Sequence, residues 1–108
     1  MAELEAEPPT VRVEVHLDPA GVQIVALSGE LDCSNAASLQ ERLASMPPRP
    51  AQPLIFDLTG LRFMDSAGIA VLISATTRAS GVSLRNPSPV IRRVLEATGL
   101  SDLFSIES

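Results

Sequence analysis

The chain has 108 residues, 45% of them hydrophobic, which fits one folded domain with one core. A formal net charge of −5 argues against nucleic acid as a partner, because phosphate binding requires clustered Lys and Arg. The single cysteine excludes an internal disulfide, and with one histidine it leaves too few ligands for a thiolate metal site, so we expect no metal or cofactor. No apolar stretch approaches the roughly 20 residues of a membrane-spanning helix, so we expect a soluble cytoplasmic protein without membrane insertion.

The N-terminal part of the chain predicts a short leader followed by a β-hairpin. Residues 1–9, "MAELEAEPP", are mostly acidic or small and include a proline pair, so we expect a flexible leader before a domain spanning residues 10–108. Apolar and polar residues alternate over Val11–Leu17, the pattern of a half-buried strand. The turn residues of Asp18–Gly21 then predict a hairpin whose second strand, Val22–Gly29, is more buried.

The middle of the chain predicts a helix followed by an interior strand. Apolar residues recur at helical spacing between Cys33 and Met46, and Ser34 is positioned to cap the first turn. The proline-rich segment 47–53 cannot continue this helix. The nearly continuous apolar run Leu54–Leu58 predicts a strand buried on both faces, and "TGLRF" after it predicts a turn.

The C-terminal half predicts two further helices and two short strands. Apolar spacing predicts a helix that begins at Ser66 and is ended by Gly81, and Val82–Arg85 is typical of a short strand. Residues 86–99, "NPSPVIRRVLEATG", predict a loop and a helix capped by Gly99, and the apolar tail predicts a last short strand. Helices between strands require parallel pairing with right-handed crossovers, so we expect an α/β fold with a mixed central β-sheet packed with helices.

The sequence "MDSAG" at the start of the second helix has two interpretations. In the first, the Ser66 hydroxyl only caps the helix, and Asp65 only complements the helix dipole. In the second, Ser66 is also phosphorylated, and the helix N-terminus accepts the added phosphate. Gly68 fits clearance for a partner's backbone or for the preceding strand, and fits a tight helix–sheet contact equally well.

Three segments carry a resemblance to a known family: "LSGELD" (Leu27–Asp32), "IFDLTGLRFMDSAGIAVL" (Ile55–Leu72) and "VIRRVLEATGLSDLF" (Val90–Phe104). Together they resemble the anti-sigma factor antagonists of the STAS domain family over nearly the whole chain. The resemblance implies that the unphosphorylated protein binds a serine-kinase anti-sigma factor and frees the sigma factor. It also implies that phosphorylation of Ser66 by that kinase switches the protein off, and that a serine phosphatase reverses the switch.

The resemblance also implies which residues form the partner surface. Asp65 and Gly68 match the acidic residue and the glycine of the family motif. Many relatives carry Ser or Thr where this chain has Ala67, a departure that removes a rival phosphate acceptor. We also place Asp32 of "GELD" at this surface, with capping of the first helix as the alternative, and Glu30 is a weaker candidate because acids in loops are commonly solvated.

Two other classes of function stay open at this stage. The chain is also compatible with a small STAS interaction subunit of a larger assembly, such as a lipid-transport complex or a stress-signalling scaffold, in which Ser66 only caps the helix. A hydrolase with Ser66 as nucleophile is disfavoured, because no base is placed to activate it and His16 falls within a strand. We therefore expect a binding protein and not an enzyme.

Overall fold

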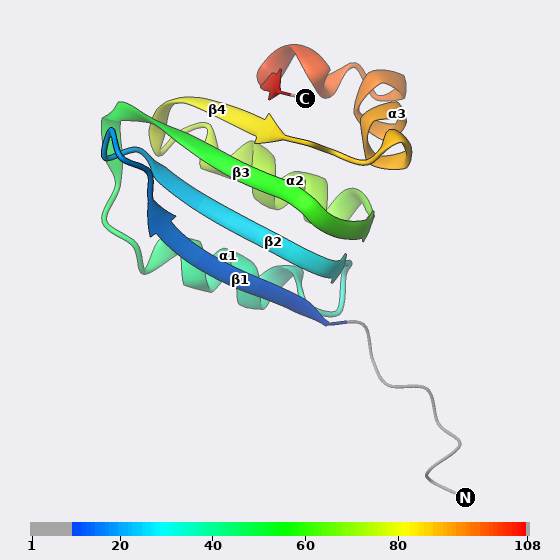
Figure 1. Ribbon diagram of the computed structural model, residues 1–108. Helices are drawn as coiled ribbons and strands as arrows, with labels where there is room; N and C mark the ends of the chain where they lie inside the picture. Colours follow the sequence, from blue (N-terminus) through cyan, green and yellow to red (C-terminus); the bar gives the residue numbers. More distant parts are fainter. Residues whose placement is uncertain (1–9, 108) are drawn as a thin grey trace, which may run out of the picture.

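The computed structural model describes residues 10–107, and the predicted leader, residues 1–9, lies outside this range. A five-stranded sheet with the strand order β1-β2-β3-β4-β5 forms the centre of the domain (Figure 1). The first pair of strands is antiparallel and every later pair is parallel, which confirms the predicted mixed sheet. The strands are β1 (Val11–Leu17), β2 (Gln23–Leu31), β3 (Arg49–Met64), β4 (Ala79–Arg85) and β5 (Ser105–Glu107).

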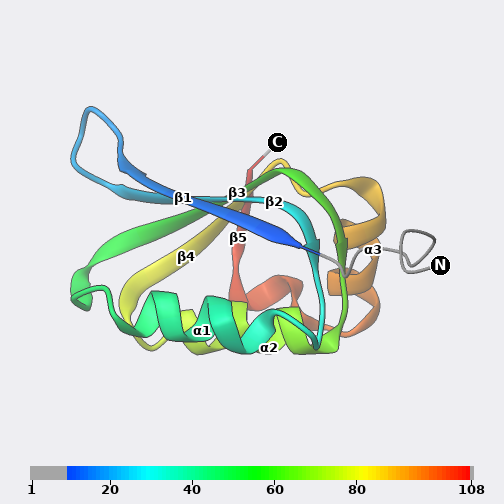
Figure 2. The same cartoon turned by 90° about the horizontal axis from the view of Figure 1, so that it is seen from below.

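The helices cover one face of this sheet (Figure 2). They are α1 (Ala36–Ala44), α2 (Ser66–Ala75), α3 (Pro89–Ala97) and the short 3-10 helix η2 (Leu100–Leu103). α1 and α2 lie side by side beneath the strands, and α3 packs near the carboxyl end of β3 (Figures 1 and 2). The α/β fold expected from the order of the elements is therefore confirmed. No helix within residues 10–107 has the length and apolar character needed to cross a membrane.

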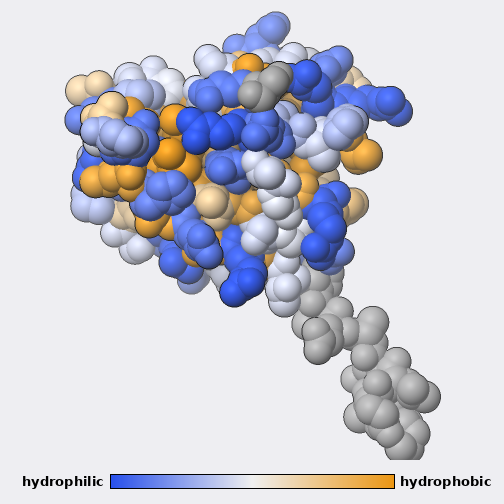
Figure 3. All heavy atoms as spheres, viewed as in Figure 1, coloured by the Kyte–Doolittle hydropathy of each residue, from blue (hydrophilic) through white to orange (hydrophobic). Residues whose placement is uncertain are grey.

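The core lies between the sheet and the helices, and it consists of the residues that the hydrophobic periodicity selects. Phe56 and Leu58 of β3 are fully buried, as are Leu72 of α2 and Leu95 of α3. In the strands, residues that point toward the helices alternate with residues that point to the other face of the sheet. The helices leave that other face open. Figure 3 shows this open face, on which hydrophilic and hydrophobic residues are interspersed.

The predicted hairpin forms around Asp18. Its side chain accepts hydrogen bonds from the backbone amides of Ala20 and Val22, at 2.8 and 2.9 Å. Gly21 has a φ of 85°, a conformation that glycine adopts without steric cost. The chain direction therefore reverses within a few residues, and β1 becomes the edge strand of the sheet.

The strand β3 is much longer than predicted. The proline-rich segment after α1 and the "TGLRF" segment both belong to it, so it runs over 16 residues. Its ends are irregular: pairing with β4 skips from Arg49 to Pro53, and pairing with β2 shifts near Ala26 and Gly29. Such irregularities accommodate proline in a strand and bend the ladder.

Two predicted helix boundaries are wrong. Ser34 does not cap α1, because the N-cap residue is Asn35 and the Ser34 hydroxyl donates a hydrogen bond to Asp32 instead. Gly81 does not end α2, because the helix already ends at Thr76, and Gly81 lies inside β4. Thr98 is the C-cap residue of α3, and Gly99, the predicted cap, follows it in the left-handed conformation. The expected last short strand is present.

Candidate functional site

The residue that caps α2 is Asp65, not Ser66. Its Oδ1 atom accepts hydrogen bonds from the backbone amides of Ala67 and Gly68, at 2.9 and 3.2 Å. Ser66 is therefore the first residue of the helix, and the prediction that its hydroxyl caps the helix is wrong. An ionised aspartate is a strong cap, since it combines a side-chain acceptor with a negative charge at the positive end of the helix dipole.

The same carboxylate also holds the turn that follows β2. Its Oδ2 atom accepts a hydrogen bond from the Cys33 amide at 3.1 Å, and the Asp65 amide donates to the Leu31 carbonyl at 3.2 Å. Leu31 and Met64, the last residues of β2 and β3, are paired in the sheet. The turn that carries Asp32 thus lies beside the start of α2, as expected from the placement of Asp32 at the same surface as Ser66.

Asp32 organises this turn. Its Oδ1 atom accepts hydrogen bonds from the Ser34 hydroxyl at 2.6 Å and from the Ser34 amide at 2.8 Å. These hydrogen bonds favour the ionised form, and they lower the pKa of Asp32 below its ordinary value of 3.8. The Asp32 carboxylate is therefore charged at neutral pH. Asp32 directly precedes Cys33, whose amide bonds Asp65.

Ser66 is exposed, and its side chain makes no hydrogen bond to any part of residues 10–107. Within residues 10–107, neither Asp32 nor Asp65 forms an ion pair. Glu30, two residues before Asp32, forms an ion pair with Arg62 at 3.9 Å. The surface around Ser66 therefore carries negative charge that no arginine neutralises, and it presents a free hydroxyl to solvent.

Gly68 has a structural reason to be glycine. It is buried in the first turn of α2, and a Cβ atom there would come within 2.7 Å of Met64 Cγ and 2.8 Å of Leu31 Cγ. Carbon atoms do not approach that closely without displacement. The tight helix–sheet contact accounts for Gly68, and the glycine brings the start of α2 against the ends of β2 and β3.

Phe63 is a residue of this region that the sequence analysis missed. It lies at the end of β3, two residues before Asp65, and its side chain is 47% exposed. It pairs with Glu30 in the sheet. Its exposure follows from the extension of β3 through "TGLRF", which the sequence alone predicts to be a turn.

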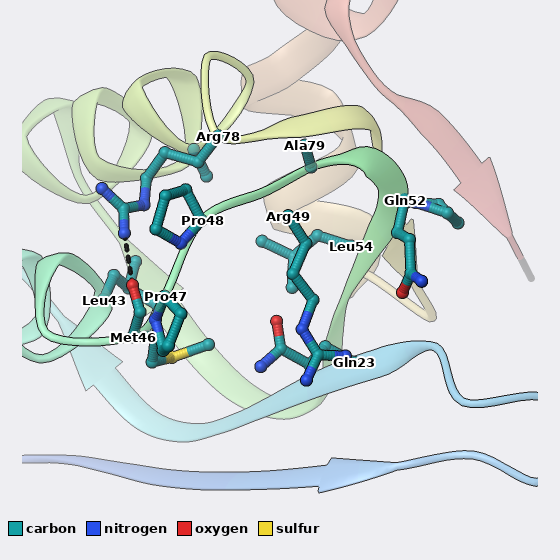
Figure 4. Close-up of a pocket in the computed structure, with 12 residues that line it drawn as sticks. Gln23, Leu43, Met46, Pro47, Pro48, Arg49, Gln52, Leu54, Arg78 and Ala79 are labelled. Atoms are coloured by element: carbon teal, nitrogen blue, oxygen red, sulfur yellow. Dashed lines mark hydrogen bonds between the residues drawn. The ribbon is translucent and has the colours of Figure 1, made fainter.

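A separate pocket lies at the opposite end of the sheet, where α1 and α2 finish (Figure 4). Its floor includes Leu43 and Leu54, and Arg78 donates a hydrogen bond to the Met46 carbonyl at its edge. None of Asp32, Asp65 and Ser66 lines it. His16, which the sequence places within a strand, is exposed on β1.

Comparison with known proteins agrees with this architecture. The family model of the STAS domain matches residues 13–108. The chain is 30% identical over 105 residues to the anti-sigma-F factor antagonist RsfB of Mycobacterium tuberculosis, covering 94% of this chain and 84% of that protein. It is 32% identical over 88 residues to the anti-sigma-B factor antagonist of Listeria monocytogenes, covering 78% and 77% of the two chains.

A solved structure extends this similarity to the fold. The crystal structure of an anti-sigma factor antagonist from Mycobacterium paratuberculosis superposes with a TM-score of 0.78 at 26% identity, over 91% of this chain and 86% of that one. The match of the family model and the similarity of these relatives cover nearly the whole domain. The chain therefore belongs to the STAS domain family, among the members named anti-sigma factor antagonists.

Proposed function

We propose that this protein is an anti-sigma factor antagonist that phosphorylation switches off. Its unphosphorylated form binds a serine-kinase anti-sigma factor at the surface formed by Asp32, Phe63, Asp65 and Ser66, which frees the sigma factor. The kinase phosphorylates Ser66, and a serine phosphatase restores the active form. Since its curated relatives are named as antagonists, we assign the chain to regulatory binding proteins and not to enzymes.

The observation that carries this proposal is the position of the Ser66 hydroxyl. A kinase needs an acceptor hydroxyl that is exposed and not engaged in the fold, and Ser66 at the first position of α2 meets both conditions. Because Asp65 performs the capping, Ser66 carries no structural duty that a phosphate would disturb. Modification at this residue therefore leaves the fold intact and alters only the surface.

The same contacts explain why a phosphate at Ser66 changes binding. The amides of Ala67 and Gly68 are already bonded to Asp65, so these N–H groups of the helix start are not available to hold the phosphate. The roughly −1.5 to −2 added charges instead face outward beside two carboxylates, and they raise the electrostatic cost of docking a partner there.

Phe63 gives this surface an apolar contact. An aromatic side chain that is half exposed next to charged groups is a typical anchor of a protein interface. Gly68 is buried against Leu31 and Met64, so we assign it the role of positioning α2 and not of touching the partner.

The test is to incubate the purified protein with a serine-kinase anti-sigma factor and ATP, and to measure phosphorylation by intact mass and binding by calorimetry. We expect one phosphate, mapped to Ser66, and loss of binding in the modified form. Ser66→Ala should accept no phosphate and keep its affinity, whereas Ser66→Asp should bind at least about tenfold more weakly, about 1.4 kcal/mol.

The outcomes separate this proposal from its rival. Equal affinity of the modified and unmodified forms for the kinase would overturn the switch. Recovery of transporter or scaffold subunits, with no kinase bound, would assign the chain to the interaction subunits of a larger assembly instead.

A further inference from the structure

The edge strand β1 is regular. Among residues 10–107 it pairs with β2 alone, over seven residue pairs without a register shift. Natural proteins commonly protect such edges with proline, a bulge or charged side chains. Val11–Leu17 contains no proline, lysine or bulge, and its charged residues are Arg12 and Glu14. An edge of this kind is suited to pairing with another strand.

The direction of the backbone groups follows from two hydrogen bonds that bracket the strand. The Glu30 amide donates to the Thr10 carbonyl, and the Asp18 amide donates to the Val22 carbonyl, both at 2.9 Å. In an antiparallel pair, hydrogen-bonded and non-hydrogen-bonded positions alternate. The even-numbered residues between Thr10 and Asp18 therefore bond to β2, and the N–H and C=O groups of the odd-numbered residues point outward.

The odd-numbered residues of β1 also carry the apolar side chains. Val11 and Val13 are partly covered by the core, but Val15 and Leu17 are 40% and 55% exposed. Figure 2 shows the reason: the hairpin end of β1 and β2 extends away from the helix layer. The part of the edge with unpaired backbone groups is thus also the part with uncovered apolar surface.

We propose that a second copy of this chain pairs antiparallel with β1, with the two-fold axis passing at Val15, and joins the two sheets into one. This register pairs Val15 with Val15 of the second copy, and Val13 with its Leu17. On the open face it places Glu14 opposite His16 of the second copy and Arg12 opposite its Asp18. Arg12 then lies opposite an acidic residue of the adjoining turn, and Glu14 lies opposite a histidine.

Neighbouring registers fit less well. An axis at Glu14 places this glutamate directly opposite itself, and like charges at such positions are destabilising. An axis at Val13 brings Arg12 opposite Glu14, but it moves Leu17 past the end of the partner's β1 and leaves its apolar side chain uncovered. Of these three registers, only the one at Val15 covers both exposed apolar residues and avoids like charges.

The register is tested by single cysteines in a Cys33→Ala background under a mild oxidant. Directly opposite residues of a hydrogen-bonded pair have Cα atoms about 5.5 Å apart, which lies within the range of a disulfide. We expect Val15→Cys to form a covalent dimer. The matched variant Val13→Cys should not, because its copy lies about 13 Å away along the strand. Cross-linking of Val13→Cys in place of Val15→Cys would overturn the proposal.

Self-association itself is tested by analytical ultracentrifugation of the full chain. We expect the dimer fraction to rise with concentration, and Val15→Pro to weaken the dimer at least about tenfold, because it removes an outward N–H that β2 does not use. Circular dichroism checks that this variant is folded, and Leu17→Lys provides a second variant that keeps the backbone groups. A wild-type chain that stays monomeric over about a hundredfold range of concentration would overturn the proposal, as would a dimer that neither variant affects.

The wild-type chain could instead stay monomeric and bind a strand of another protein, with Val15→Pro abolishing that binding. This result would also rule out a second copy of the chain as the partner of β1. Ser66 lies on another element, so Ser66→Asp is expected to leave self-association unchanged. The proposed dimer and the proposed phosphorylation switch can therefore be tested independently of each other.

Discussion

The starts of α1 and α2 are neighbours, yet they use their polar side chains in opposite ways. Asp65 turns toward its own helix and bonds the amides of Ala67 and Gly68. Asn35, the N-cap residue of α1, makes no side-chain cap and instead accepts from the Asp32 amide and donates to the Glu30 carbonyl. The start of α2 is thus fixed by a side-chain cap. The start of α1 is fixed by a turn in which Asn35 bonds residues that precede it in the chain.

The difference explains why Ser66 is free. Asp65 satisfies α2 with one oxygen and holds the Cys33 amide with the other, so both helix starts depend on the same carboxylate. Ser66 stands beside this arrangement without taking part in it. A position that is structurally idle within an otherwise bonded region suits a reversible modification, because adding a group there breaks no existing contact.

The largest expected effect comes from Gly68, which places the start of α2. Gly68→Val should destabilise the fold by about 3 kcal/mol, since a larger side chain overpacks the contact with Leu31 and Met64. Urea denaturation measures the change. Gly81→Val is the control, because a Cβ atom at Gly81 meets nothing within 4 Å, and this variant should lose no stability. Equal losses in the two variants would show that packing at Gly68 is not special.

The second prediction compares the two N-cap residues directly. Asp65→Ala should cost about 2 kcal/mol, because it removes a cap and the link to Cys33 together. Asn35→Ala removes the hydrogen bonds to the Asp32 amide and the Glu30 carbonyl and should cost about 1 kcal/mol. Hydrogen exchange adds a second readout: the Cys33 amide should lose protection in Asp65→Ala. If Asn35→Ala proved the more damaging of the two, the shared role of Asp65 would be refuted.

The third prediction concerns Ser66, where we expect almost no change in stability. Ser66→Ala should shift the free energy of unfolding by less than about 0.5 kcal/mol, because the hydroxyl caps nothing and alanine is a good helix former. Thermal and urea unfolding provide the measurement. A loss as large as that of a removed cap would return Ser66 to a structural role and weaken the proposed function.

The smallest effect is a dependence on pH carried by Asp32. Its pKa is lowered in the folded protein, so its contribution to stability is present above its ordinary pKa of 3.8 and is lost as the pH falls through the lower folded value. Urea unfolding of wild type and Asp32→Asn, from neutral pH downward, measures this. The difference between the two proteins should shrink only below about pH 3.8. A constant difference across the range would mean that the charge of Asp32 does not matter.

The sequence predicts the fold well because burial follows periodicity. The alternation in Val11–Leu17 and the helical spacing around Leu72 and Leu95 are local signals that the tertiary structure reinforces. The length of β3 was not predictable in this way, since its prolines and Gly60 indicate loops when considered alone. They are tolerated in a strand because the pairing is irregular at those points, and this depends on neighbouring strands.

The site was predicted in part. The sequence predicts that Asp32, Asp65 and Ser66 lie close together, and in the structure they do. The reason is that the carboxyl ends of parallel strands meet at one edge of a sheet. It assigned the cap to Ser66, since both residues of an Asp-Ser pair are good caps and only the backbone geometry decides between them. It passed over Phe63, whose exposure depends on the extension of β3 past the end of β4.

The hydrogen bond from the Cys33 amide to Asp65 has a practical use. Cys33 is the only thiol in the chain, and it is exposed. A fluorescent dye attached to Cys33 lies on the residue whose amide bonds the Asp65 carboxylate, and no engineered cysteine is needed. The unaltered protein thus carries its own labelling point, at which the proposed binding of a kinase and the proposed phosphorylation can be tested in real time.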